Sequence, residues 1–144
     1  MADGDAFTCG FVVPGLARGK GSPRSTIVGG RSRIYTDAET RNEIAVVRSF
    51  ASIAMESRPP YDGAVVLRLC AYRPIPASFS RKKREAAERG EIDPVTKPDV
   101  DNFVKLASDA LNGIVIVDDR QIVRLIADKK YSHQPRLELS VRSR

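Results

Sequence analysis

KPDVDNFVKLASDALNGIVIVDD, residues 97–119, is the stretch that decides the fold of this chain. Behind Pro98, apolar residues recur at helical spacing. The pattern predicts a helix from about Asp99 to Asn112, with Gly113 as its left-handed stop. The apolar face of this helix consists of Val100, Phe103, Val104, Ala107 and Leu111.

Two pairs of aspartates flank the predicted helix. Asp99 is a natural N-cap, and Asp101 lies in the first turn with Lys105 beside it at i, i+4 spacing. The second pair, residues 118–119, follows a four-residue apolar strand expected over residues 114–117. Clustered carboxylates repel each other, so a fold that gathers them usually needs a cation. The pattern favours a divalent metal site, and ordinary helix capping with a polar turn is the alternative.

Two better-known sites are excluded by spacing. An EF-hand loop that began at Asp99 would need an oxygen ligand, a glycine and a glutamate at its fifth, sixth and twelfth positions. Those positions hold Phe103, Val104 and Ala110. A phosphate-binding loop is also excluded, because residues 15–22 have one residue too few between the glycines and no Ser or Thr after the lysine. We therefore expect no nucleotide cofactor.

Composition indicates one domain, residues 1–144, with a positive charge. Lys and Arg outnumber Asp and Glu by 24 to 18, which gives a net charge of +6. This balance favours a polyanionic partner, although a merely basic surface is the alternative. Cys9 and Cys70 form no CxxC pair, and we expect two reduced thiols in a cytoplasmic protein. His133 is the single histidine, and this count argues against a His-rich zinc site or a Ser-His-Asp triad centred elsewhere. We expect His133 on the surface.

The other elements predict a mixed α+β fold, a small mixed β-sheet packed with two or three helices. No segment approaches the ~18 apolar residues of a membrane span, so no membrane partner is expected. A helix should start at a Thr36–Glu39 capping box and end before Pro59, and a short exposed basic helix should cover residues 80–89. Residues 14–35 are expected to form a Gly- and Pro-rich loop. Strands are expected at residues 7–13, 64–72 (buried on much of both faces), 121–131 and 137–141.

Basic segments are candidates for contacts with nucleic-acid phosphates, with a solvated surface as the alternative. Residues 14–35 carry five positive charges and no negative charge, and the basic helix begins SRKKR. The candidates are Lys20, Arg24 and Arg33, followed by Arg81, Lys82, Lys83 and Arg84.

The elements KPDVDNFVK, ALNG and VDD together resemble the RusA-type Holliday-junction resolvases. The similarity is firm from about Lys97 to Tyr131 and looser upstream, so that it covers most of the chain. It implies a homodimeric, Mg²⁺-dependent endonuclease that cuts four-way DNA junctions by paired symmetric nicks, with Mn²⁺ as a substitute metal. It also implies a bacterial source, often a phage or prophage. A four-way junction has approximate two-fold symmetry, which suits a dimer with two matched sites.

The resemblance also assigns roles to individual residues. It implies that Asp99, Asp101 and Asp119 bind the metal, with Asp118 as a further candidate. Lys105 takes the place of the catalytic lysine, and Lys97 matches a basic position beside the site that would contact DNA. The N-terminal loop departs from the family, because GKGSPRS replaces a compact KPRPR. The alternatives are a non-catalytic DNA-binding module and a metal-dependent hydrolase of another phosphodiester.

Overall fold

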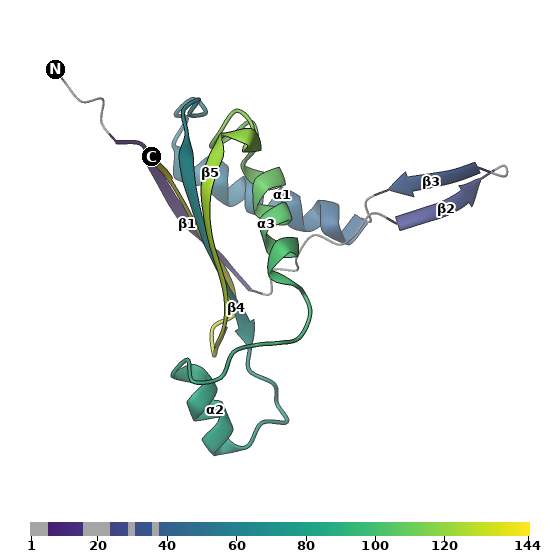
Figure 1. Cartoon of the computed structure of the whole chain (residues 1–144), viewed down its shortest axis with the longest axis vertical. Coiled ribbons are helices and arrows are strands. Elements are labelled where there is room, and N and C mark those ends of the chain that lie inside the picture. Colours follow the sequence, from purple (N-terminus) through teal and green to yellow (C-terminus); the bar gives the residue numbers. More distant parts are fainter. Residues whose placement is uncertain (1–5, 16–23, 29–30, 36–37) are drawn as a thin grey trace.

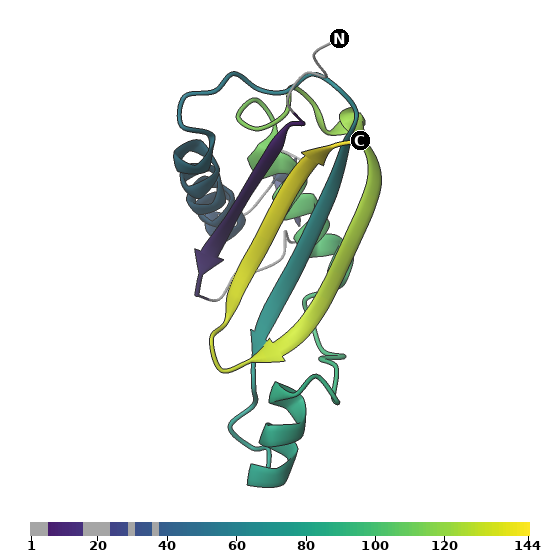
Figure 2. The same ribbon diagram turned by 90° about the vertical axis from the view of Figure 1, so that its left-hand side faces the viewer.

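The computed structural model describes the backbone of residues 6–15, 24–28, 31–35 and 38–144, and the side chains of residues 6–15 and 38–144. Four strands form a mixed sheet in the order β1-β6-β4-β5, seen face-on in Figure 2. They are β1 (Thr8–Pro14), β4 (Val65–Pro74), β5 (Ile122–Ser132) and β6 (Arg136–Ser143). β4 and β5 are parallel, whereas β6 runs antiparallel to β1 and to β4. A parallel pair needs a long crossover, and the crossover from β4 to β5 carries both acidic pairs.

Two helices cover one face of the sheet, and no described element covers the other face (Figures 1 and 2). The covering helices are α1 (Ala38–Met55) and α3 (Val100–Leu111). Along β4, Leu67 and Leu69 face the helices and are buried, whereas Arg68 between them is exposed. This strand was expected to be buried on both faces, and it is buried mainly on the helix side. The mixed α+β fold itself is confirmed.

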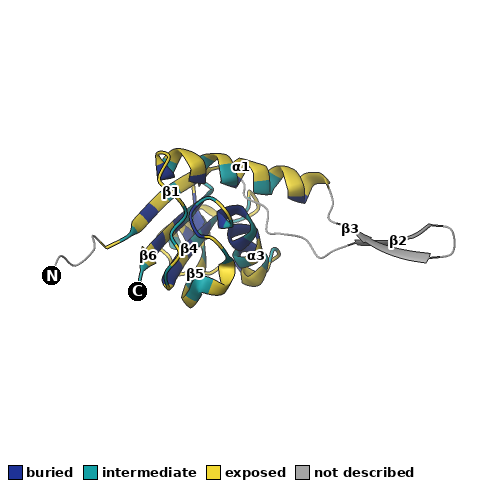
Figure 3. Cartoon of the chain, turned by 90° about the horizontal axis from the view of Figure 1, so that it is seen from above, coloured by how far each residue is buried: buried dark blue, intermediate teal, exposed yellow. Residues whose placement is uncertain are grey.

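The hydrophobic core lies between the sheet and the two covering helices (Figure 3). Phe103 and Leu111 of α3 and Val47 of α1 are fully buried. Each large apolar side chain buried in this way contributes about 1.5–3 kcal/mol. Because this packing fixes the rotation of α3 about its axis, the polar edge of the helix with Asp101 and Lys105 faces solvent.

An arginine of α1 holds the C-terminal end of α3. The Nη1 atom of Arg48 donates to the carbonyl oxygens of Asn112 (2.8 Å), Asp109 (3.3 Å) and Ala110 (3.4 Å). Carbonyls at this end lack partners within the helix and carry the negative end of its dipole. Gly113 follows with a φ of 78°, the left-handed conformation that the sequence predicted.

The segment expected to be a loop, residues 14–35, contains two strands. β2 (Arg24–Val28) and β3 (Arg31–Tyr35) pair antiparallel with each other. Thr26, Ile27, Val28, Ile34 and Tyr35 are residue types that favour strands, and a Gly-Gly dipeptide separates the two runs in the sequence, which is typical of hairpins. The many basic and small residues around them obscured this pattern. The capping box predicted at Thr36 lies outside the described residues.

The apolar run at residues 114–117 forms a turn and not the predicted strand. Gly113 donates its backbone N–H to the Ile116 carbonyl at 2.7 Å, and Ile116 forms only isolated bridges, with Tyr61 and Asn112. The run is apolar because Val115 and Ile116 are fully buried in the core. Four residues are too few for periodicity to separate a buried turn from a buried strand.

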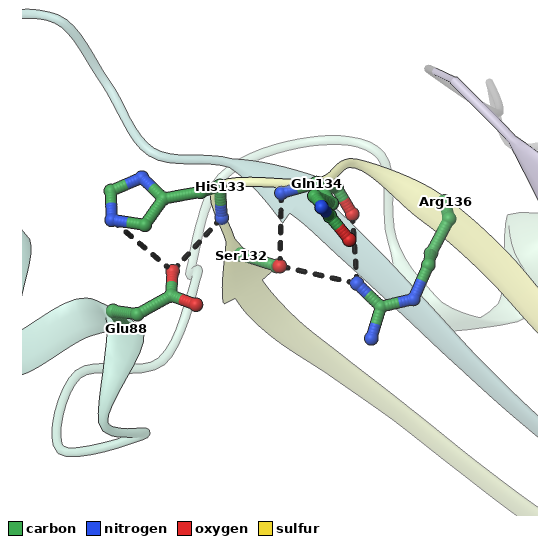
Figure 4. A network of polar contacts seen from close by, with 5 residues as sticks. All are labelled: Glu88, Ser132, His133, Gln134 and Arg136. Carbon is green, nitrogen blue, oxygen red and sulfur yellow. Dashed lines mark hydrogen bonds and ion pairs between the residues drawn. The ribbon is translucent and has the colours of Figure 1, made fainter.

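The basic helix α2 (Arg81–Glu88) is tied to the turn between β5 and β6 (Figure 4). Glu88 accepts a hydrogen bond from the backbone N–H of His133 at 2.9 Å and lies 3.6 Å from its imidazole. Ser132 Oγ accepts from the backbone of Gln134 (3.0 Å) and from Arg136 Nη1 (3.2 Å). These contacts hold α2 at one end of the sheet and confirm His133 as a surface residue.

Cys9 and Cys70 are both free thiols, the first buried and the second half-buried, and burial raises the pKa of each. No helix in the described part of the chain is both long and apolar enough to cross a bilayer.

Candidate functional site

The N-terminal end of α3 presents two exposed carboxylates. Asp99 occupies the N-cap position with an extended backbone (φ −70°, ψ 155°), but its side chain makes no capping hydrogen bond. Its backbone carbonyl accepts the N–H of Asn102 at 3.1 Å. Asp101 follows in the first turn, and both aspartates are exposed. Capping therefore does not occupy the Asp99 carboxylate, which can bind a cation.

The predicted pair of Asp101 and Lys105 is present. Lys105 Nζ lies 3.3 Å from Asp101 Oδ2, at i, i+4 on one face of α3. More than half of each side chain is exposed, 55% for Lys105 and 65% for Asp101. Exposed pairs of this kind contribute roughly 0.3–0.5 kcal/mol to stability. The main consequence of the contact is therefore the position of the ammonium group beside the Asp101 carboxylate.

A lysine from the sheet fixes the chain that leads into this site. Lys129 of β5 donates from Nζ to the carbonyl oxygens of Thr96 (2.7 Å) and Pro98 (3.0 Å). Between these residues lies Lys97, which is exposed and precedes a cis peptide bond to Pro98. Lys129 thereby holds the chain on both sides of Lys97, the residue that was predicted to contact DNA, two positions before Asp99.

Lys129 was not singled out in the sequence, although alternation along β5 carried a signal. Ala127 and Tyr131 lie two residues to either side of Lys129, and both are at least partly buried. Side chains two residues apart in a strand share a face. A lysine on a partly covered face must reach a hydrogen-bond acceptor, and in this fold the acceptors are the two carbonyls before α3.

Replacing Lys129 with methionine is expected to lower the free energy of unfolding by about 1–2 kcal/mol. Methionine keeps the apolar stem but removes the charged donor from two carbonyls. Urea denaturation measures the change. The matched control is Lys130→Met, because Lys130 is adjacent, exposed and on the other face of β5. We expect that control to change stability by less than about 0.5 kcal/mol. Equal losses in the two variants would contradict the role given to Lys129.

The second acidic pair lies in a turn built around a glutamine. Asp118 precedes the short 3-10 helix η1 (Asp119–Gln121), and its side chain accepts the N–H of Arg120 at 2.9 Å. Gln121 Oε1 accepts the N–H of Asp118 at 2.8 Å. Gln121 Nε2 donates to the carbonyls of Tyr61 (2.7 Å) and Gly63 (2.9 Å). The turn is therefore fastened to the segment that precedes β4, and Asp118 acts as its cap.

The two carboxyls of this turn have opposite pKa shifts. The hydrogen bond from the backbone of Arg120, with a second one shared with Asp119, lowers the pKa of Asp118. The bond shared with Asp118 raises the pKa of Asp119, and slight desolvation and the negative charges of Asp118 and Asp109 act in the same direction. Several negative charges therefore lie close to Asp119. A cation bound there would reduce their mutual repulsion.

The two acidic pairs lie at opposite ends of α3. Asp119 is close enough to Asp109 to feel its charge. Asp109 is about 12 Å from Asp101 along the helix axis, at about 1.5 Å per residue. Accordingly, within the described ranges no three His, Cys, Asp or Glu side chains are placed to hold one metal ion. The cage predicted from Asp99, Asp101 and Asp119 is not closed within one chain.

Asp99 and Asp101 are the kind of donors that an incompletely enclosed Mg²⁺ ion takes. Enzymes usually hold Mg²⁺ through one or two carboxylates, and waters and substrate phosphates complete its octahedral shell. Two exposed carboxylates at the start of one helix meet this requirement. Asp119 would be a third ligand only if the Asp119 of a second copy of the chain reached the start of α3.

Apart from Lys97, the predicted phosphate-contacting residues fall into two groups. Arg81, Lys82 and Lys83 are exposed on α2, and Lys83 Nζ lies 4.1 Å from the centre of the Phe79 ring. Arg84 of the same group is half-buried on α2. The other group is in the N-terminal third. Arg24 lies on β2 and Arg33 on β3, opposite Tyr35 and Thr26 respectively, and Lys20 lies outside the described residues.

Comparison with known proteins agrees with the motifs. The family model of the endodeoxyribonuclease RusA matches residues 14–142, which include α1, α2, α3 and both acidic pairs. A curated relative, the uncharacterized protein YqaN of Bacillus subtilis (strain 168), is 40% identical over 136 residues. The alignment covers 92% of this chain and 94% of YqaN. The chain belongs to the RusA endodeoxyribonuclease family.

Proposed function

We propose that this protein is a Mg²⁺-dependent endonuclease that resolves four-way DNA junctions by paired symmetric nicks. The observation that carries the proposal is the start of α3, which holds both the Asp99 carboxylate, not engaged in capping, and the Asp101–Lys105 pair. Family membership and the net charge of +6 support DNA as the substrate. The proposal includes action in recombination, repair or phage DNA processing in the bacterial cytoplasm.

Hydrolysis of a phosphodiester needs a nucleophilic water, neutralised phosphate oxygens and a stabilised leaving oxygen. Bound Mg²⁺, or Mn²⁺ in its place, supplies this chemistry. Asp99 and Asp101 would hold the ion, and Lys105 would place a further positive charge against the scissile phosphate. Lys97, on the loop that Lys129 fixes, would contact the DNA backbone next to the site.

The proposed assembly is a homodimer. Paired cuts in a junction of two-fold symmetry require two equivalent sites. In one chain the acidic pairs lie at opposite ends of α3, so two antiparallel α3 helices related by a two-fold axis would bring Asp119 of one copy towards Asp101 of the other. Asp118 already caps its own turn and is therefore the weaker ligand candidate of its pair.

The test is cleavage of a labelled synthetic four-way junction, with a linear duplex of the same arm sequence as the control substrate. We expect paired nicks in the junction with Mg²⁺, no product with EDTA, and no cleavage of the duplex. Junction binding without any product in Mg²⁺ would identify a non-catalytic DNA-binding module. Faster cleavage of a small phosphodiester than of the junction would identify a hydrolase with another substrate.

A further inference from the structure

The uncovered face of the sheet faces the viewer in Figure 2. It carries three exposed arginines on the adjacent strands β6, β4 and β5. The register places Arg142 of β6 and Arg124 of β5 on either side of Val66 in β4. Arg68 lies two residues further along β4, with the same orientation as Val66. Adjacent strands are about 4.8 Å apart, so the backbones of Arg124 and Arg142 lie about 10 Å from each other. Arg68 lies on the strand between them, one row further along.

These three arginines are exposed, and no hydrogen bond or ion pair engages them within the described part of the chain. With Val66, Ile126 and Ser140 they line a pocket of about 310 Å³ whose lining includes no acidic side chain. The nearest acids on this face, Glu138 and Asp128, flank Cys70 in the next row. Glu138 is engaged by Arg136 at 2.7 Å.

Three unpaired guanidinium groups around one pocket repel one another, so an anion that they share is bound favourably. Guanidinium is planar, always charged and able to donate two parallel hydrogen bonds, which matches the oxygens of a phosphate. The surrounding sheet face is broad and carries no covering element among the described residues, as Figures 1 and 2 show. An extended polyanion can lie across such a face.

We propose that Arg68, Arg124 and Arg142 form a second contact surface for the phosphate backbone of DNA, on the side of the sheet opposite α3. The inference rests on the proposed function for its DNA substrate. The arms of a branched DNA diverge, and a chain that contacts phosphates on both sides of its sheet holds two arms at once. Such contacts bind phosphates without reading the base sequence.

The test compares two double variants of the full chain that each remove two positive charges. Arg124→Gln/Arg142→Gln removes two of the three cluster members, and Arg41→Gln/Arg58→Gln removes two exposed arginines, one in α1 and one shortly after it, outside every segment predicted to contact DNA. Binding to the four-way junction is measured by fluorescence anisotropy over a series of KCl concentrations in EDTA. Each lost phosphate contact reduces the slope of log K against log salt by about 0.9.

In the cluster variant we expect the magnitude of this slope to fall by about 2 and junction binding at low salt to be roughly 10-fold weaker. The control variant should keep the wild-type slope. The cluster variant should keep the wild-type melting temperature, because the two replaced side chains are exposed and make no hydrogen bond or ion pair within the described residues. An unchanged slope in the cluster variant would overturn the inference, and so would equal losses in the two variants. Sedimentation that shows a wild-type dimer lost only in the cluster variant would also overturn it, because a second copy would then occupy this face.

Binding is measured in EDTA, where no cleavage is expected, so the result does not depend on whether the protein is a nuclease. A protein that never cuts the junction but shows the reduced slope in the cluster variant would refute the proposed activity and support the second contact surface. A protein that cuts the junction but shows no change of slope would support the activity and refute the surface.

Discussion

Asp101→Asn is expected to lower the rate of junction cleavage in Mg²⁺ by roughly 10²–10³-fold or more, while junction binding in EDTA stays at the wild-type level or becomes tighter. Asparagine has nearly the same shape but lacks the charge that holds a divalent ion, and it also releases Lys105 from its 3.3 Å contact. Loss of one negative charge near the DNA reduces repulsion. Because the pair is exposed, the free energy of unfolding should fall by less than about 1 kcal/mol.

Asp93→Asn provides the matched control, because Asp93 is an exposed aspartate in the linker before Lys97. It makes the same chemical change outside the candidate site and should leave cleavage and binding unchanged. Single-turnover cleavage and anisotropy in EDTA measure the two quantities separately. An Asp101→Asn protein that still cuts at nearly the wild-type rate would remove the start of α3 from the mechanism.

The helix that carries the site was predictable because several independent signals agree there. An apolar stripe at helical spacing, an acidic first turn and a glycine stop predicted residues 99–112, and α3 spans Val100–Leu111. β1, β4, β5 and β6 also lie close to their predicted positions. β2 and β3 were missed because strand-forming residues are interleaved with arginines and flanked by Gly and Pro, so that composition favoured a loop.

The local part of the site was predictable, and its long-range part was not. The contact between Asp101 and Lys105 follows from helix geometry alone. The Lys129 contact joins β5 to a loop more than 30 residues away in sequence, and no local pattern specifies such a pair. The separation of the acidic pairs follows from the tight turn after α3, where Gly113 and Ile116 are hydrogen-bonded and Gln121 fastens the next turn to Tyr61. The spacing of residues along the chain does not predict these hydrogen bonds.

A mixture of two inactive variants is expected to recover nicking activity if the acidic pairs meet across two copies. Asp101→Asn and Asp119→Asn should each be inactive alone. When they are unfolded together and refolded, roughly half of the dimers contain one copy of each. Each site of such a dimer combines Asp101 of one copy with Asp119 of the other. One site therefore has both carboxylates intact, and the other site has lost both.

The mixed dimer is therefore expected to make single nicks in the junction but no paired cuts, at up to about a quarter of the wild-type number of active sites. Gel separation of nicked from resolved junctions measures the two products, and a mixture of Asp101→Asn with Asp99→Asn serves as the control. Both of its substitutions lie at the same end of α3 and remove ligands from each site of a mixed dimer, so no activity should return. A mixture of Asp101→Asn and Asp119→Asn that stays as inactive as this control, in protein shown to exchange subunits, would mean that Asp119 does not act with the Asp101 of another copy. The separation of the two acidic pairs along α3 would then assign the chemistry to Asp99, Asp101 and Lys105 alone.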